Sequence, residues 1–376
     1  MSELDPERQN QAKEYAKKRR RLGFINFIVS TILILALIVT PLSKSIASHL
    51  PGTLVLAAAL YLVILMLAYD VLMLPLSYRT GYKLPKDYGL LHQPFSGWIT
   101  DHFKSLVVGI AFGAAAVAVM FFLLEHSPSW WWLIVWGLLL IITLVMTVLA
   151  PIVFIPLFYK MRPLEDGDLK NRLNEVAKTA GVKVSGIYVI LFSEKTTLAN
   201  AAVMGLGRTK RIVISDTLIS AYSPEEIDVV MAHELGHQRH ADVWRLFGFQ
   251  SVVYLAVFWL ASWLYGNLVN QLDYVNLSNP AALPLFLFCI TVVAAPILPL
   301  QSWFSRKIEA NADAFALELT QEPQVFISAM TKLTDQNLGE SRPSNILERL
   351  GQDHPSYVDR VKMAEEFSTK TASRVG

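Results

Sequence analysis

Long apolar stretches alternate with polar ones along this chain, and six of the apolar stretches reach the length of a membrane-spanning helix. Crossing the hydrocarbon core of a bilayer takes roughly 20 mostly apolar residues in a helix. The six stretches are 24–43, about 52–76, about 105–124, about 130–157, about 246–265 and about 283–300. This pattern predicts a multi-pass α-helical membrane protein with about six transmembrane helices.

The polar stretches divide the chain into four parts. Residues 1–157 would hold an N-terminal tail and four crossings, 246–300 two further crossings, and 301–376 a helical tail. The remaining part, 158–245, contains an amphipathic helix candidate at 167–181 and a strand candidate at 185–192. Its residues 197–215 read as a hairpin that turns near Gly205 and Gly207. We therefore expect a mainly α fold with a small β-containing cytoplasmic part.

Composition supports the membrane assignment and excludes some classes of site. Apolar residues make up 53% of the chain and charged residues 17%, whereas soluble domains carry about a quarter charged residues. The net charge of +2 gives no indication of a nucleic-acid partner. Cys289 is the only cysteine, which excludes an internal disulfide and a cysteine-rich metal site.

Basic residues in the loops predict the orientation in the membrane. Residues 17–21 read KKRRR, and six crossings place 77–104, 158–245 and 301–376 on the same side as that run. The loops on the opposite side contain only Lys44. Because lysine and arginine accumulate in cytoplasmic loops, we expect both termini in the cytoplasm.

A helix in the polar part carries candidate metal chemistry. It is predicted to begin at Ser223, followed by proline and a glutamate that completes a capping box, and to run toward Arg245. It contains HELGH, in which His233 and His237 lie four residues apart and so share one helix face. Two imidazoles in this arrangement suit zinc, and Glu234 is placed to take a proton from a zinc-activated water.

Zinc would need a third protein ligand from elsewhere in the chain. The spacing HExxHxxGxxH fails here, because position 240 is histidine and position 243 is valine. The best candidate is the stretch SRKIEANADAFALEL at 305–319, where Glu309 and Asp313 lie four apart on one helix face. One carboxylate could bind zinc while the other accepts a hydrogen bond from a histidine ligand. Taken alone, this stretch could equally be a solvated polar face.

These motifs together resemble a known family. HELGH followed some 70 residues later by SRKIEANADAFA is similar to the integral-membrane zinc metalloproteases of the CAAX prenyl protease family. Further similar segments occur in the family's order at 88–105, 155–173, 197–219 and 353–361. The resemblance covers most of the chain from about residue 50 onward.

The resemblance implies a ligand set and a catalytic base. One zinc ion would be held by His233, His237 and Glu309, with Glu234 as general base. Asp313 would orient one of the ligands. The implied fold is a ring of transmembrane helices around a large water-filled chamber, with zinc near its cytoplasmic end.

Three further residues gain a role only through the resemblance. His354 would steady the oxyanion, although on sequence alone it could be an ordinary surface histidine. Arg360 matches an arginine near the same site, where a plain salt bridge is an equal alternative. Asn200 lies in the segment similar to a substrate-aligning edge strand, but could simply end a strand.

The expected function is therefore a membrane-embedded zinc metalloendopeptidase. Its partners would be membrane lipid and a hydrophobic or lipidated, CAAX-like C-terminal peptide. The chain departs from the eukaryotic pattern by having six crossings instead of seven, short loops and no obvious endoplasmic-reticulum retrieval tail. These departures favour a bacterial cell-membrane protein and leave prenyl specificity open.

Three other functions stay open. A quality-control protease that trims misfolded membrane proteins shares the HExxH motif. A site-2-type intramembrane protease fits less well, because Arg239, His240, Asp242 and Arg245 place the motif at the membrane edge. A transporter or scaffold would keep its function when Glu234 is replaced by glutamine, whereas a hydrolase would lose turnover.

Overall fold

The computed structural model describes residues 3–342 and 352–375 of the chain. Six helical stretches in this part are long and apolar enough to cross a membrane, as predicted. They contain helices α1 (Pro6–Val39), α3 (Leu54–Tyr78), α4 (Leu84–Asp87), α5 (Phe95–His126), α6 (Trp131–Leu149), α7 (Ile155–Phe158), α11 (Asp242–Gln271), α12 (Leu283–Ala294) and α13 (Leu298–Thr320). The short α2 (Leu42–Ser48) follows α1. Residues 343–351 of the predicted helical tail lie outside the described part.

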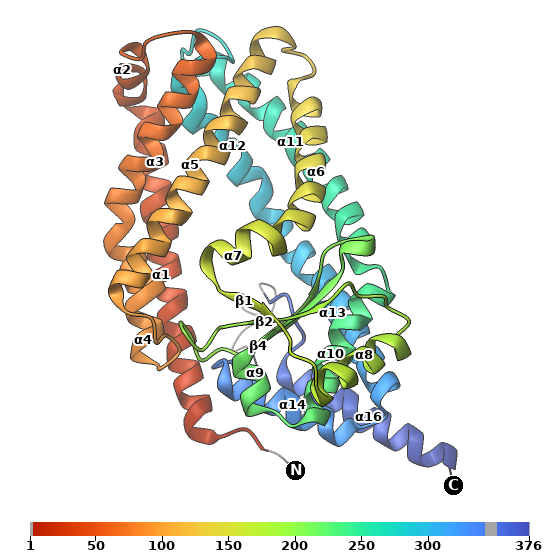
Figure 1. The fold of residues 1–376 in the computed structure, drawn as a ribbon. Coiled ribbons are helices and arrows are strands. Elements are labelled where there is room, and N and C mark those ends of the chain that lie inside the picture. Colours follow the sequence, from red (N-terminus) through yellow and green to blue (C-terminus); the bar gives the residue numbers. More distant parts are fainter. Residues whose placement is uncertain (1–2, 343–351, 376) are drawn as a thin grey trace.

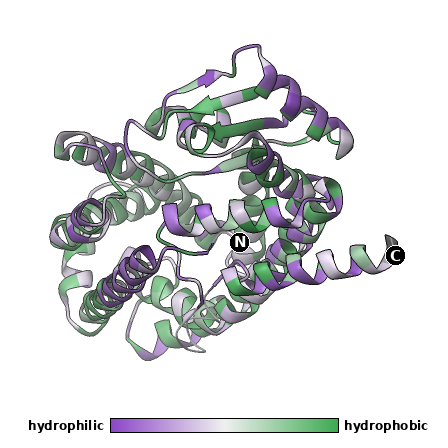
Figure 2. Ribbon diagram, turned by 90° about the horizontal axis from the view of Figure 1, so that it is seen from below, coloured by the Kyte–Doolittle hydropathy of each residue, from purple (hydrophilic) through white to green (hydrophobic). Residues whose placement is uncertain are grey.

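The long helices stand roughly parallel around a common centre, with α1, α3 and α5 on one side and α6 and α11 on the other (Figure 1). Both termini lie at the same end of the molecule. Seen from that end, hydrophilic residues are frequent on the nearest helices and loops (Figure 2). Large apolar side chains on the helix surfaces are exposed, among them Phe24, Val71, Val107 and Trp263. In a multi-pass membrane protein such side chains contact lipid.

Two predicted helix limits need correction. The first crossing is part of a longer helix, because Asp5 accepts hydrogen bonds from two first-turn N–H groups and starts α1 at Pro6. The KKRRR run therefore belongs to the helix. The helical stretch of the sixth crossing does not end at residue 300, since a 3-10 turn (Ala295–Ile297) leads from α12 directly into α13. Pro296 and Pro299 each occupy a first turn, where proline's missing N–H leaves no helical bond unmade.

The polar part holds a four-stranded sheet in the order β1-β2-β4-β3. Its strands are β1 (Met161–Pro163), β2 (Ile187–Ile190), β3 (Ala201–Met204) and β4 (Arg211–Ser215). The predicted hairpin is β3–β4, and β2 is a shorter form of the predicted strand at 185–192. Gly205 has a φ of +93°, and a β-carbon there would come within 2.6 Å of the Thr209 carbonyl oxygen, so the turn requires glycine. Strand β1 was not predicted, and β3 forms one edge of the sheet.

Helices pack on this sheet and form a hydrophobic core with it. They are α8 (Asp168–Thr179), which matches the predicted amphipathic helix, α9 (Asp216–Ala221), α10 (Pro224–Arg239), α14 (Pro323–Gln336) and α16 (Tyr357–Val375). Fully buried side chains from the helices, such as Leu173, Leu235 and Phe326, meet Ile214 of β4 in this core. Helix α13 extends from the membrane helices into it, because Ala316 and Leu317 belong to the same cluster.

Candidate active site

The HELGH motif lies on α10, which starts as predicted and ends earlier than predicted. Ser223 and Glu226 form a reciprocal capping box, with the Glu226 carboxylate accepting from the Ser223 N–H at 2.8 Å. The helix ends at Arg239 and does not run on toward Arg245. Ala241 takes a left-handed conformation (φ 56°), and a new helix, α11, begins at Asp242.

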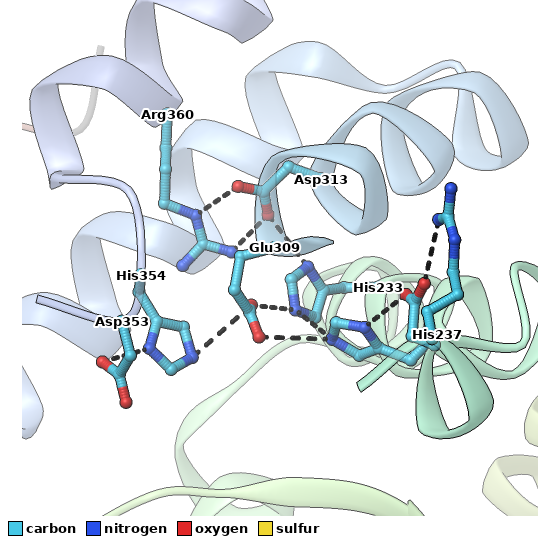
Figure 3. A network of polar contacts seen from close by, with 9 residues as sticks. His233, His237, Glu309, Asp313, Asp353, His354 and Arg360 are labelled. Atoms are coloured by element: carbon cyan, nitrogen blue, oxygen red, sulfur yellow. Dashed lines mark hydrogen bonds and ion pairs between the residues drawn. The ribbon is translucent and has the colours of Figure 1, made fainter. Parts of the chain in front are cut away.

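Three of the predicted residues come together at one point. One ligand atom from each of His233, His237 and Glu309 lies within 4.8 Å of the others (Figure 3). The two histidine Nε2 atoms are 3.3 Å apart. Glu309 brings Oε2 to 3.2 Å from Nε2 of His233 and Oε1 to 3.6 Å from Nε2 of His237. These atoms converge from α10 and α13.

The hydrogen bonds behind the two histidines fix which nitrogen faces the centre. Nδ1 of His233 lies 2.9 Å from Oδ1 of Asp313, and Nδ1 of His237 lies 3.0 Å from Oδ2 of Asp242. A carboxylate accepts only, so each Nδ1 carries the proton and each Nε2 presents a lone pair. Carboxylate partners on histidine ligands are usual in metal sites, where they set the tautomer.

The facing lone pairs and the Glu309 carboxylate repel one another unless a cation lies between them. Oε2 of Glu309 is buried and no hydrogen bond within the described residues satisfies it. Burial lowers the pKa of His233, but the neighbouring carboxylates of Asp313 and Glu309 outweigh this and raise the pKa to about 10. A positive charge is thus strongly favoured here. Two imidazoles and one carboxylate also match the ligand preference of zinc.

Each carboxylate behind the histidines is itself neutralised by an arginine. Asp313 is fully buried, and Arg360 donates to both of its oxygens, with Nε at 2.9 Å from Oδ2. Asp242 is 2% exposed, and Nη1 of Arg245 lies 3.2 Å from its Oδ1. A buried carboxylate is costly unless it is paired in this way. Arg360 therefore has the salt-bridge contact that was one of its two alternatives.

Close approach of α13 to α10 sets the position of Glu309. A β-carbon on Gly236, inside HELGH, would lie 3.1 Å from the Phe315 ring and 3.3 Å from Cα of Ala312. Ala312 is fully buried. The glycine and alanine together allow the two helix backbones to pack closely, which brings Glu309 within reach of the histidines.

The remaining candidates lie around this centre at different distances. Glu234 is largely buried next to His233, and burial raises the pKa of its carboxyl group. His354 points toward the centre (Figure 3), with Nε2 3.4 Å from Oε2 of Glu309 and Nδ1 2.9 Å from Oδ1 of Asp353. Its side chain is 57% exposed, so it is accessible to a substrate.

Asn200 is not part of this cluster. It is exposed, and its backbone pairs with Ser215 at the start of the β3–β4 hairpin. Edge strand β3 is tied to the motif helix instead through Gln238, whose Nε2 donates to the Val203 carbonyl at 3.1 Å. The edge strand thus runs beside the helix that carries both histidines.

Sequence reasoning missed the contact of Asp242 with His237. The helix was expected to continue through this position, which would have turned Asp242 away from the preceding histidine. Residues 238–242 contain neither glycine nor proline, so the local sequence carries no signal for a helix end at Ala241.

Comparison with known proteins shows the family of the chain. Residues 163–368 match peptidase family M48, and residues 1–160 match the CAAX prenyl protease N-terminal region, described as five membrane helices. The chain belongs to peptidase family M48. It is a multi-pass membrane metalloprotease of the CAAX prenyl protease type. Within 3–160 the structure has four helical stretches long enough to cross a membrane, one fewer than that description gives.

Relatives of this M48 chain occur in bacteria and eukaryotes. An uncharacterized metalloprotease, YhfN, of Bacillus subtilis is 27% identical over 94% of this chain and 85% of its own length. CAAX prenyl protease 1 of Saccharomyces cerevisiae is 27% identical over 79% of this chain and 69% of its own. The crystal structure of S. mikatae Ste24p superposes with a TM-score of 0.85 at 24% identity, covering 96% of this chain and 90% of that one. That likeness shows the same fold.

Proposed function

We propose that this M48 metalloprotease uses zinc, held by His233, His237 and Glu309, to hydrolyse peptide bonds near the C-terminus of hydrophobic or lipidated substrates. The observation that supports this most is the convergence of two Nε2 lone pairs and a buried carboxylate at one point. Asp313 and Asp242 hold the two rings in the tautomer that a metal requires.

Glu234 would act as the general base and then the general acid. When bound, zinc would lower the pKa of a water molecule to about 7 and polarise the scissile carbonyl. Glu234 is adjacent to the first histidine and would take the proton from the attacking water. Burial raises the pKa of Glu234, so the carboxyl group can hold that proton and deliver it to the leaving amine.

His354 would stabilise the negative charge on the carbonyl oxygen. Asp353 holds Nδ1 at 2.9 Å, so Nε2 is the ring atom that faces the centre. The exposed ring reaches the site from the opposite side to α10, next to Glu309. A hydrogen bond from this ring to the developing oxyanion would stabilise it.

A substrate peptide would bind as an added strand on β3. Strand β3 is an edge of the sheet, and an extended peptide gains main-chain hydrogen bonds there. Asn200 stands at the start of this edge and would help to place the peptide. Relatives named CAAX prenyl protease support a lipidated CAAX-like substrate. The basic N-terminal run supports a cytoplasmic location of both termini, and the Bacillus subtilis relative supports a bacterial cell membrane.

The test compares the purified chain with its Glu234→Gln variant on two peptides. One peptide carries a farnesylated C-terminal CAAX sequence and the other is the same peptide without lipid. We expect both proteins to bind one zinc ion per chain and only the wild type to cleave the lipidated peptide. Equal cleavage of both peptides would contradict CAAX specificity and favour a quality-control protease of broad specificity. Turnover by Glu234→Gln at the wild-type rate would refute the assigned base.

A further inference from the structure

A cavity of about 650 Å³ opens between α1 and the end of α3, away from the metal centre. Four basic residues line it: Lys18 and Arg21 from α1, Arg79 and Lys83 from the turn after α3. A single carboxylate, Asp87, lies among them. We call this feature the basic cavity. Its charge is complementary to an anion.

Two of the four cations in the basic cavity are already engaged. Lys83 forms an ion pair with Asp87 at 2.6 Å, and Lys18 donates to the Tyr88 hydroxyl at 2.9 Å. Arg21 and Arg79 have no hydrogen-bond or ion-pair partner within the described residues. Their guanidinium groups, which can each grip a phosphate in bidentate fashion, are therefore available to a ligand.

The other half of the basic cavity is apolar. Leu22 and Ile25 on α1 and Pro75 and Leu76 on α3 line it. On α1 the apolar run begins directly after Arg21, and on α3 it ends shortly before Arg79. The cavity thus straddles the boundary between the apolar and polar sections of two membrane helices. Its cations lie on the polar side and its apolar walls on the membrane side.

We propose that the basic cavity binds an anionic glycerophospholipid from the leaflet that faces the polar part of the protein. Arg21 and Arg79 contact the phosphate, and an acyl chain lies along Leu22, Ile25 and Leu76. The phosphate then lies on the polar side and the hydrocarbon on the membrane side, as in a lipid at the membrane surface. Basic pockets between transmembrane helices are a general solution for holding acidic lipid headgroups.

The test measures lipid binding to the full-length protein in detergent by native mass spectrometry. The probes are dioleoyl phosphatidylglycerol, dioleoyl phosphatidylcholine and inorganic phosphate. We expect phosphatidylglycerol to bind at least about 10-fold more tightly than phosphatidylcholine. The double variant Arg21→Gln/Arg79→Gln should weaken the binding of phosphatidylglycerol by about 30-fold. This is the factor expected when two cations are lost from an anionic-lipid site.

A matched control removes the same amount of charge from α1 outside the cavity. Lys17→Gln/Arg19→Gln changes two exposed residues that do not line it, and we expect less than about a 3-fold effect on phosphatidylglycerol. Equal losses of phosphatidylglycerol binding in both double variants would overturn the proposal, because they would show a non-specific electrostatic attraction between the basic helix and the lipid. Inorganic phosphate bound as tightly as the lipid would also overturn it.

A second variant tests the apolar half without changing any charge. Ile25→Trp fills the space assigned to the acyl chain, and Ile25 is already partly exposed. We expect weaker phosphatidylglycerol binding with an unchanged Tm. If Arg21→Gln/Arg79→Gln fails to fold, Ile25→Trp alone tests the lipid site. Unchanged lipid binding by Ile25→Trp would refute the site.

Discussion

The carboxylate of Asp242 accepts a hydrogen bond from Nδ1 of His237 at 3.0 Å, although the two residues lie on different helices. The left-handed backbone at Ala241 makes this possible, because it ends α10 and turns the first residue of α11 back toward the motif. Asp313 makes the equivalent contact to His233 from α13. The two histidines are therefore held from behind by two different parts of the chain.

Replacement of Asp242 should weaken metal binding. In Asp242→Asn the carboxylate that fixes the His237 tautomer is lost, and we expect zinc affinity to fall by about 10–100-fold. Competition with a chromogenic chelator measures this. Arg245→Gln is the control, because it removes the arginine 3.2 Å from Asp242 and leaves the bond to His237 in place. Zinc affinity in Asp242→Asn equal to that of the wild type would contradict the role assigned to this contact.

A methyl group added at Gly236 should reduce activity without unfolding the protein. In Gly236→Ala the new β-carbon meets Phe315 and Ala312, so α13 must shift by a few tenths of an ångström and carry Glu309 with it. We expect kcat/KM to fall by about 10-fold or more, since misplacement by 1 Å can cost about 100-fold. Gly248→Ala on α11 is the matched control, because its β-carbon meets nothing within 4 Å. Equal activity of the two variants would show that this packing does not position Glu309.

Removal of the His354 ring should lower kcat and leave the metal in place. His354→Ala takes away a proposed oxyanion donor, and such donors contribute about 100- to 1,000-fold to kcat. Zinc content should stay at the wild-type level, because the ring is not one of the three converging groups. Peptide kinetics and metal analysis on the same sample check both statements. Loss of zinc together with activity would instead make His354 a ligand.

Glu226 should make stability depend on pH. The residue is 4% exposed. Burial raises the pKa of its carboxyl group, but hydrogen bonds from Lys332, Ser328 and the Ser223 N–H prevail and lower the pKa below the ordinary 4.5. The ionised form therefore stabilises the fold. This contribution is complete above pH 4.5 and is lost as the pH falls through the lower folded value.

The variant Glu226→Gln should therefore lower the free energy of unfolding by about 1–3 kcal/mol at pH 7. Its Tm should converge with that of the wild type as the pH falls below 4.5, which thermal unfolding in detergent can follow. Glu225→Gln, at the exposed neighbour that pairs with Arg172, should have a smaller effect. A Tm difference that is the same at low and neutral pH would rule out this explanation.

The membrane helices could be predicted from the sequence because each is a long run of one residue class. Their ends could not, since these depend on local bonds such as the Asp5 cap and the 3-10 turn at Ala295–Ile297. Strand β1 was missed for a related reason. It has three residues, one of them Pro163, and it exists only because β2 pairs with it. So short a segment carries no periodic signal.

The candidate site shows the same division between local and distant information. His233, His237 and Glu234 follow from helical spacing, and Glu309 with Asp313 from the need for a partner on a second helix. The ion pair of Asp313 with Arg360 joins residues 47 apart in sequence. Only the family resemblance made Arg360 a candidate site residue. The contact of Asp242 depends on one backbone conformation at Ala241, which the side-chain pattern does not encode.

Helix α13 begins at Leu298 within the sixth membrane stretch and carries Glu309 without a break. The eleven residue steps from Leu298 to Glu309 span about 16 Å of rigid helix. A tilt of about 5° at the membrane end therefore moves the carboxylate by about 1.4 Å, more than the contact distances around the histidines can absorb. A spanning helix that does not match the thickness of the bilayer can accommodate the difference by tilting. The lipid surroundings thus become part of the catalytic geometry, and this enzyme should work best in a membrane of one particular depth.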